Sequence, residues 1–165
     1  MDGARQAVDT RPMIQVMDME LSPARAADYD EIIAIVNDWW GRAISDSLPR
    51  LFLDHFYRTS LVARDHDSAL TGFLIGVLSP SQPHRAYIHF VGVAPAARGY
   101  GLGGRLYEEF FALARAAGAS RVGAITSPVN AGSIAFHKSM GFEVTGPVVD
   151  YDGPGKDMMV FDRAL

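Results

Sequence analysis

The stretch that decides the fold runs from Val91 to Arg105 and reads VGVAPAARGYGLGGR. A β-rich apolar run from Tyr87 to Val93 leads into it, and the residues after it repeat apolar side chains at helical spacing: Leu106, Phe110, Leu113 and Ala117. Glycines between a strand and a helix are typical of an anion site, because free N–H groups and the helix dipole attract a phosphate. Arg98 and Arg105 add positive charge. The stretch predicts a phosphate-binding turn, and a merely flexible connection is the plain alternative.

Two other phosphate-binding motifs fit this turn less well. A Walker loop ends in Gly-Lys-Ser/Thr, whereas Gly104 is followed by Arg105 and Leu106. Gly99, Gly101 and Gly104 do spell the G-x-G-x-x-G of a dinucleotide fold. That fold also needs an acidic residue about 20 residues later and a second nucleotide-binding half, and the sequence offers neither. An NAD(P)-binding oxidoreductase is therefore kept only as a remote alternative.

The rest of the sequence divides into short strands and helices. Alternation predicts strands and recurrence at three and four residues predicts helices. The predicted strands are 13–21, 60–64, 70–78, 87–93, 121–126, 142–149 and 158–161, and the predicted helices are 28–38, 47–58, 103–117 and 130–140. The order β-α-α-β-β-β-α-β-α-β-β predicts one mixed α/β domain over 13–165. Residues 1–12 lack periodicity and are expected to be a disordered leader.

The composition excludes several classes of protein. Of 165 residues, 48% are hydrophobic and 21% are charged, which is enough apolar material for a packed core. The net charge of −4 argues against nucleic acid as a partner. The absence of Cys excludes disulfides, thiolate metal sites and a Cys nucleophile, and the scattered His residues show no metal-ligand spacing, so we expect no metal. Without a long apolar run or a signal peptide, we expect a cytoplasmic protein that does not bind membranes.

Two blocks of sequence resemble the GNAT acetyltransferases. Residues 98–103, RGYGLG, resemble the Arg/Gln-x-x-Gly-x-Gly/Ala signature that holds the pyrophosphate of acetyl-CoA, and residues 130–142 resemble the family's Asn-x-x-Ser/Ala helix that ends in Gly-Phe. With the strand before them, the blocks cover about Tyr87 to Phe142, whereas the N-terminal third matches only in the order of its elements. The resemblance implies a twisted mixed sheet of about seven strands flanked by about four helices. It also implies acetyl-CoA as the co-substrate, and homodimers are frequent in the family.

The resemblance assigns cofactor contacts residue by residue. The backbone of Val91 and Val93 pairs with the pantetheine arm, and Asn130, Ser133 and Phe136 line the cofactor side of the second block. The pyrophosphate site comprises Arg98, Gly99, Tyr100, Gly101, Leu102, Gly103, Gly104 and Arg105. Asn130 also fits the role of a helix cap and Phe136 that of a core residue.

The family's reaction is direct attack of a neutral amine on the thioester, which needs a base and a proton donor. The central strand carries no acid, so His89 is the candidate base. Strict alternation places Tyr87, His89, Val91 and Val93 on one face of that strand. A structural, hydrogen-bonded His89 is the alternative. His137 stands near the place where many members have a donor Tyr, and Tyr87 is a substitute donor or a plain strand aromatic.

The acceptor wall is expected after the first helix, at Trp39, Trp40 and Arg42. One Trp is expected in the core and the other on the wall, and Arg42 can pair with an acidic group of the substrate. The predicted activity is transfer of acetyl from acetyl-CoA to a primary amine, with a small or amino-acid-like acceptor favoured over protein. A non-catalytic acyl-CoA sensor is the alternative.

Overall fold

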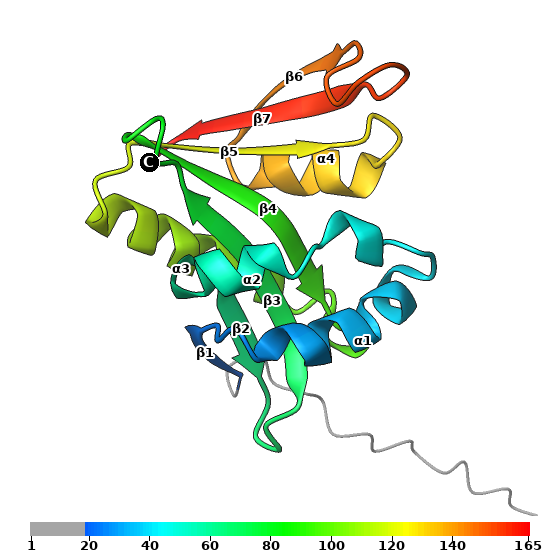
Figure 1. Ribbon diagram of the computed structural model, residues 1–165, viewed down its shortest axis with the longest axis vertical. Coiled ribbons are helices and arrows are strands. Elements are labelled where there is room, and N and C mark those ends of the chain that lie inside the picture. The colour runs from blue at the N-terminus through cyan, green and yellow to red at the C-terminus, as the bar shows by residue number, and fades with distance from the viewer. Residues whose placement is uncertain (1–18) are drawn as a thin grey trace, which may run out of the picture.

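The computed structural model describes residues 19–165 (Figure 1). Its strands are β1 (Glu20–Pro23), β2 (Leu61–Arg64), β3 (Leu70–Leu78), β4 (Arg85–Val93), β5 (Arg121–Thr126), β6 (Glu143–Val148) and β7 (Met158–Ala164). Its α-helices are α1 (Asp28–Trp40), α2 (Leu51–Phe56), α3 (Leu102–Ala116) and α4 (Ala131–Ser139). Short 3-10 turns lie at Ser45–Ser47, Tyr57–Thr59 and Pro95–Ala97. None of the described helices is long and apolar enough to cross a membrane.

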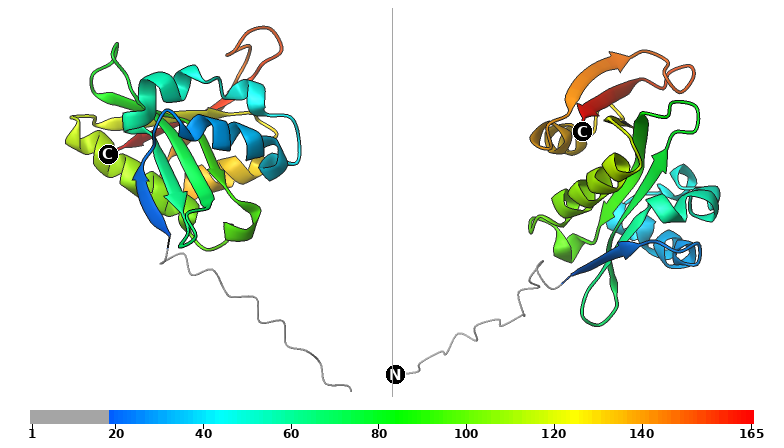
Figure 2. Two further views of the ribbon diagram at one scale, coloured as in Figure 1. Left: turned by 60° about the horizontal axis from the view of Figure 1, so that its bottom comes forward. Right: turned by 90° about the vertical axis from the view of Figure 1, so that its left-hand side faces the viewer.

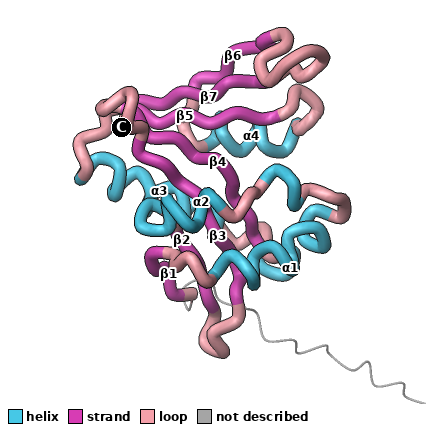
Figure 3. Tube along the Cα trace, viewed as in Figure 1, coloured by secondary structure: helices cyan, strands magenta, loops and turns pink. Residues whose placement is uncertain are grey.

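The order of strands and helices confirms the prediction, and the differences lie at the ends of elements (Figure 3). α1 continues to Trp40 instead of ending at Asp38, because both tryptophans still pack on the sheet and the helix stops only at Gly41. The predicted second helix is divided into α2 and a 3-10 turn. The predicted leader and residues 13–18 of the first predicted strand lie outside the described residues.

The seven strands form one sheet in the order β1-β2-β3-β4-β5-β7-β6. Only β4 and β5 pair in parallel, and every other neighbouring pair is antiparallel. A dinucleotide fold has a mostly parallel, doubly wound sheet. The topology therefore contradicts the remote alternative of an NAD(P)-binding fold.

Helices cover both faces of the sheet, α1 and α2 on one face and α3 and α4 on the other (Figure 2). Two buried clusters correspond to these layers. One contains Leu106, Phe110 and Phe111 of α3 together with Ile88 of β4. The other joins α1 and α2 to the opposite face of β3. Of the apolar stripe predicted for α3, Leu106 and Phe110 are buried, Leu113 is half-buried and Ala117 is exposed just beyond the helix end.

β4 and β5 are joined at one end and part at the other. Their parallel pairing extends only from Arg85 to Tyr87 on β4. At that end Asp162 of β7 accepts hydrogen bonds from Arg85 (2.7 Å) and from the Nε of Arg121 (2.8 Å). Arg121, with Arg85, lowers the pKa of the Asp162 carboxyl. The ion pairs fix the closed end, and the strands are free to diverge beyond it.

Candidate functional site

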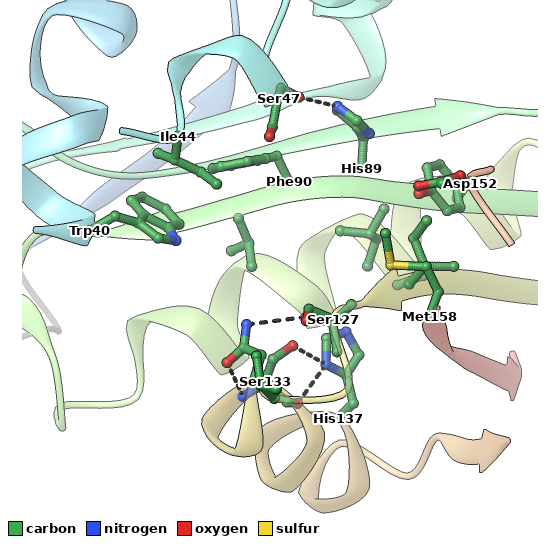
Figure 4. Close-up of a pocket in the computed structure, with 18 of the residues that line it drawn as sticks. Trp40, Ile44, Ser47, His89, Phe90, Ser127, Ser133, His137, Asp152 and Met158 are labelled. Carbon is green, nitrogen blue, oxygen red and sulfur yellow. Dashed lines mark hydrogen bonds between the residues drawn. The ribbon is translucent and has the colours of Figure 1, made fainter. Parts of the chain in front are cut away.

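A cavity of about 730 Å³ lies where β4 and β5 diverge (Figure 4). Its walls come from both strands, from α4, from the connection between α1 and α2, and from the turn between β6 and β7. Tyr107 is the contribution of α3. The topology thus brings together segments that are far apart in sequence. Eight of the nineteen predicted site residues line this space: Trp40, Arg42, Tyr87, His89, Val91, Asn130, Ser133 and His137. Residues 98–105 of the glycine turn are not among them.

A β-bulge at His89 corrects the predicted face of β4. Ile75 of β3 lies opposite Phe90 while the next residue, Gly76, lies opposite Ile88, so His89 is the extra residue. The bulge shifts the alternation by one position. Val91 and Val93 therefore pack toward α3, as Ile88 does, whereas His89 stacks on Phe52 of α2 with ring centroids 3.7 Å apart. The expectation that His89 shares a face with Val91 and Val93 is wrong, because alternation holds only without a bulge.

His89 nevertheless lines the cavity, in a defined tautomer. Its Nε2 lies 2.9 Å from the backbone oxygen of Ser47. A carbonyl oxygen only accepts, so Nε2 carries the hydrogen and Nδ1 of the neutral ring keeps a lone pair. No described residue bonds to Nδ1. Burial lowers the pKa of His89, partly offset by the bond to Ser47, so the ring is neutral at pH 7.

Asn37 of α1 holds the loop that orients His89. Its Oδ1 accepts hydrogen bonds from the amides of Ile44 (2.8 Å) and Ser45 (3.0 Å), and its Nδ2 donates to the Ser45 hydroxyl. These bonds fix the 3-10 turn that presents the Ser47 carbonyl to His89. The tautomer of the histidine is thus set by α1 through the connecting loop.

The glycine turn has the geometry of an anion site. Gly99 and Gly101 adopt φ values of 82° and 87°, a backbone region that other residues enter at a cost. Gly101 is the N-cap of α3 and makes no side-chain cap, so the first amides of the helix have no intrahelical acceptor. Gly103 lies close to Phe136 of α4, and Gly104 lies close to Met140, the residue that follows α4. Leu102, predicted to contact a cofactor, is buried at 1% exposure in the cluster beneath α3.

The two arginines of this turn make backbone contacts. Arg98 donates from Nε to the Val93 carbonyl (3.0 Å) and from Nη2 to the Trp39 carbonyl, so it ties the end of β4 to the end of α1. Arg105 donates to the carbonyl of Met19 (3.1 Å). Tyr100 is exposed. Arg98 therefore has a positioning role that the sequence did not indicate, besides the charge that it brings to the turn.

The backbone of Val91 and Val93 faces the gap between the strands. The amide of Ala94 donates to Thr71 of β3 (2.9 Å), so the adjacent pair Gly72–Val93 is a non-hydrogen-bonded pair. Leu74–Val91, two residues further along, is another. The N–H and C=O groups of both valines point away from β3, toward the side that β5 leaves open. An extended ligand can add there as a strand does.

α4 borders the other side of the cavity. Asn130 caps the helix, since its Oδ1 accepts from the Ser133 amide (3.2 Å) while its Nδ2 donates to Thr126 (3.1 Å). Its role as a cap is confirmed, and contact with a cofactor stays a prediction. Asn130 and Ser133 line the cavity. Phe136 does not, and its ring packs edge-on against Tyr107 at 4.9 Å.

His137 is buried in a hydrogen-bonded pair with Tyr107. Its Nδ1 donates to the Ser133 carbonyl (2.8 Å), so its Nε2 accepts from the Tyr107 hydroxyl (3.0 Å). The ring also stacks on Phe161 with centroids 3.8 Å apart. Burial lowers the pKa of His137 and raises that of Tyr107, so both are neutral at pH 7. At 4% exposure His137 is not the surface cation that its place near the helix end allowed.

Replacing His137 with Ala is expected to destabilise the fold by about 3 kcal/mol or more, because it leaves a cavity and an unpartnered Tyr107 hydroxyl. At roughly 2 to 4 °C per kcal/mol, the melting temperature falls by about 10 °C. Differential scanning calorimetry measures this. Lys138→Ala, exposed on the same helix, is the control and changes stability by less than about 0.5 kcal/mol. A loss no larger than the control's would contradict a packing role for His137.

The lowered pKa of His137 also predicts a pH dependence of stability. Between pH 6.5 and the lowered value, the unfolded chain binds a proton that the folded chain does not. The free energy of unfolding therefore falls as the pH drops through this window. His89 contributes with the same sign, so the slope becomes smaller in His137→Ala and does not vanish.

Tyr87 keeps its proton at neutral pH. It lines the cavity, and burial, with smaller contributions from Tyr151 and Asp152, raises its pKa to about 12. Its hydroxyl makes no hydrogen bond to a described residue, in contrast to that of Tyr107. Tyr87 therefore offers an uncommitted O–H to the cavity.

The predicted acceptor wall is divided as expected. Trp40 lines the cavity and packs against Phe90 at 5.0 Å, whereas Trp39 stacks on Phe73 at 6.0 Å and belongs to the core. Both lie in the last turn of α1 and not after it, which corrects the predicted boundary. Arg42 lines the cavity with no charged partner among the described residues.

Asp152 is a cavity residue that sequence reasoning missed. It comes from the turn between β6 and β7, and Figure 4 shows it at the same end of the cavity as Met158. The turn lies far from β4 in sequence, and no motif marks it as a part of the site. Within residues 19–165 no group of three or more His, Asp and Glu side chains is placed to hold a metal ion, and a metal-free site stays a prediction.

Comparison with known proteins agrees with this architecture. Residues 29–142 match the acetyltransferase (GNAT) family, while no curated protein sequence matches the chain. The structure of Ard1 from Thermoplasma volcanium is similar with a TM-score of 0.75 at 18% identity, over 90% of this chain and 98% of that one. That of yncA from Salmonella typhimurium, solved with its cofactor acetyl-CoA, is 25% identical with a TM-score of 0.66, over 90% and 94%. A ribosomal-protein-alanine N-acetyltransferase from Brucella melitensis is 26% identical with a TM-score of 0.66, over 88% and 99%.

Proposed function

Because the chain belongs to the GNAT acetyltransferase family, we propose that it transfers the acetyl group of acetyl-CoA directly to a primary amine. One observation carries the proposal. The gap between β4 and β5 has the anion site of α3 at one end and a neutral histidine with an open lone pair at the other. A cofactor that lies along the gap would present its thioester to the histidine.

The cofactor is expected to use backbone groups for most of its contacts. Its pyrophosphate would accept hydrogen bonds from the first amides of α3, where the helix dipole adds to the attraction. The pantetheine amides would pair with the outward-facing backbone groups of Val91 and Val93, chiefly both groups of Val91 and the N–H of Val93, because the Val93 carbonyl already accepts from Arg98. Asn130 and Ser133 would contact the arm from α4. The binding of acetyl-CoA by yncA, at 25% identity, supports this placement.

His89 is the proposed base. The amine reacts in its neutral form, and its nitrogen becomes acidic once it bonds to the thioester carbon. Nδ1 of His89 would then take the proton, directly or through one water molecule. The bond from Nε2 to Ser47 keeps the ring in the tautomer that this step requires, and it also stabilises the imidazolium that forms.

Tyr87 is the proposed hydrogen-bond donor to the departing thiolate. His137 occupies the place of the family's donor Tyr, but both of its ring nitrogens are engaged and its ring is neutral. The Tyr107 hydroxyl is committed to His137. The O–H of Tyr87 is protonated at neutral pH and available, so it suits stabilisation of the negative charge on sulfur.

A small acceptor is favoured over a protein segment. The α1–α2 connection and the β6–β7 turn both border the cavity, through Ile44 and Ser47 on one side and Asp152 on the other. Loops on both sides form an enclosed pocket, which suits a small molecule, more readily than the open groove that a protein segment needs. The acceptor would reach the thioester through this pocket.

The proposed function is tested by a thermal-shift titration with acetyl-CoA, CoA and NAD, followed by thiol release with a panel of amines. Ligand at about 100 times Kd adds about 2.7 kcal/mol, hence roughly 5 to 10 °C in Tm. We expect shifts with acetyl-CoA and CoA, and thiol release with at least one amine. A shift without release from any amine would favour a non-catalytic acyl-CoA sensor. No shift with acetyl-CoA would overturn the proposal.

A further inference from the structure

The charges in the cavity point to the acceptor. Among the described residues that line it, Arg42 and Asp152 are the formally charged ones, since His89 and His137 are neutral. They come from the two loops that border the acceptor side: Arg42 follows α1, and Asp152 lies between β6 and β7. Neither forms an ion pair with a described residue. Both residues are exposed, so the border of the cavity carries one cation and one anion that form no ion pair with a described residue.

Asp152 is not needed to build its own turn. Asp150 accepts from the Gly155 amide (2.6 Å), and Asp157 accepts from the Asp150 amide (3.0 Å). The backbone of Asp152 donates to the Lys156 carbonyl (3.2 Å). These bonds hold the turn and fix the position of Asp152, while its carboxylate stays uncommitted and faces the cavity next to Tyr87.

Arg42 is held in a comparable way. Its amide donates to the carbonyl of Asn37 (3.2 Å), directly after the Gly41 cap of α1. Asn37 is the residue that also fixes the loop beneath His89. The backbone of Arg42 is thus part of the assembly that orients the base, while its guanidinium has no charged partner among the described residues.

Polar and apolar side chains both line the space between these charges. Trp40, Ile44 and Phe90 form one wall, and Met158 lies near Asp152 (Figure 4). A charged group of a ligand binds best where an opposite charge faces it, and an analogue that lacks the group loses that ion pair.

We propose that the acceptor is a small α-amino acid or a close zwitterionic analogue, with its ammonium attracted by Asp152 and its carboxylate bound by Arg42. This inference rests on the proposed N-acetyltransferase function. Asp152 brings the amine to the end of the cavity where Tyr87 and His89 lie, and the amine loses its proton to solvent before it attacks. Arg42 gives the planar, two-pronged contact that a carboxylate accepts. The apolar wall receives the side chain.

The test compares amino acids with the same amines lacking the carboxylate. Thiol release from acetyl-CoA is measured with alanine, methionine and phenylalanine, and with ethylamine, 3-(methylthio)propylamine and 2-phenylethylamine. For the amino acid that reacts best, we expect kcat/KM to be at least about 10-fold higher than for the amine that lacks its carboxylate. Arg42→Gln should remove this preference by raising KM for the amino acid alone. Asp152→Asn should raise KM for both members of the pair, while the Tm shift with acetyl-CoA is unchanged.

Matched controls separate the site from overall charge. Asp67→Asn, on the β2–β3 turn, and Arg115→Gln, at the far end of α3, remove the same charges on the exposed surface away from the cavity and should leave both KM values unchanged. The inference would be overturned, but not the proposed function, if amines that lack the carboxylate or peptide N-termini reacted as well as the amino acids. An Arg42→Gln variant that still preferred amino acids would overturn it in the same way. Binding of acetyl-CoA without thiol release from any amine would overturn both.

Discussion

Replacing Gly101 with Asp is expected to abolish binding of acetyl-CoA while the protein stays folded. An ideal Cβ at this position meets no atom within 4 Å, so the new side chain does not clash. It lies at the N-cap of α3, where the proposed pyrophosphate site needs open amides and positive potential. The carboxylate would cap those amides itself and repel the phosphates. We expect the Tm shift with acetyl-CoA to disappear and Kd to rise by at least about 100-fold, as isothermal titration calorimetry measures.

Gly118→Asp is the matched control for backbone strain. Gly118 follows the opposite end of α3, has φ near that of Gly101 (90° against 87°), and also has no atom within 4 Å of an added Cβ. Each substitution should cost about 1 to 2 kcal/mol of stability, since a left-handed backbone disfavours Asp. Only Gly101→Asp should lose the cofactor. Equal loss of affinity in both variants would mean that strain, and not the anion site, explains the effect.

The part of the fold that was predicted from sequence is the part governed by local rules. The glycine turn before α3 follows from a strand, four glycines and an amphipathic stripe, and the structure has each of them in place. The order of elements follows in the same way from periodicity and turn residues. Asn130 as a cap follows from its place before a helix. These features depend on neighbours within about four residues in sequence, which is the range that periodicity and capping rules describe.

The bulge at His89 could not be read from sequence. The run from Tyr87 to Val93 is apolar apart from His89 and carries no sign of an interruption, and the extra residue appears only in the pairing of β4 with β3. The result is a histidine on the opposite face from Val91 and Val93. Bulges often change the direction of a side chain near functional sites. The wrong prediction for the face of His89 therefore lies where a departure from strand alternation is expected.

Contacts between elements that are distant in sequence also could not be predicted from the sequence. His137 and Tyr107 lie on different helices, and their hydrogen bond depends on how α4 packs against α3. Asp152 reaches the cavity only because β7 pairs with β5 and carries the β6–β7 turn over it. Arg98 was expected to supply charge, whereas it also bonds to the carbonyl of Trp39, 59 residues away in sequence, and with its bond to Val93 it ties β4 to α1. Each of these roles is set by tertiary packing.

Replacing His89 with Gln is expected to lower kcat/KM by about 10² to 10⁴ while leaving the affinity for acetyl-CoA nearly unchanged. Gln is close in size and its amide N–H can still donate to the Ser47 carbonyl, so the loop keeps its contact while Nδ1 is lost as a base. Steady-state thiol release and the Tm shift with acetyl-CoA measure the two effects separately. Phe52→Leu is the control for the loss of ring stacking, and it should change kcat/KM far less.

The pH dependence of kcat/KM tests the role of His89 as a base. Ionisation of the free amine gives log kcat/KM a slope of one across the acidic and neutral range, because only the neutral amine reacts. His89 adds a second unit of slope below its own pKa, which burial holds under 6.5. This extra slope should vanish in His89→Gln and persist in Asp152→Asn, which excludes the other titratable group at that end of the cavity. If the extra slope survives in His89→Gln, the proton leaves through another group, and His89 only positions the loop that carries Ser47.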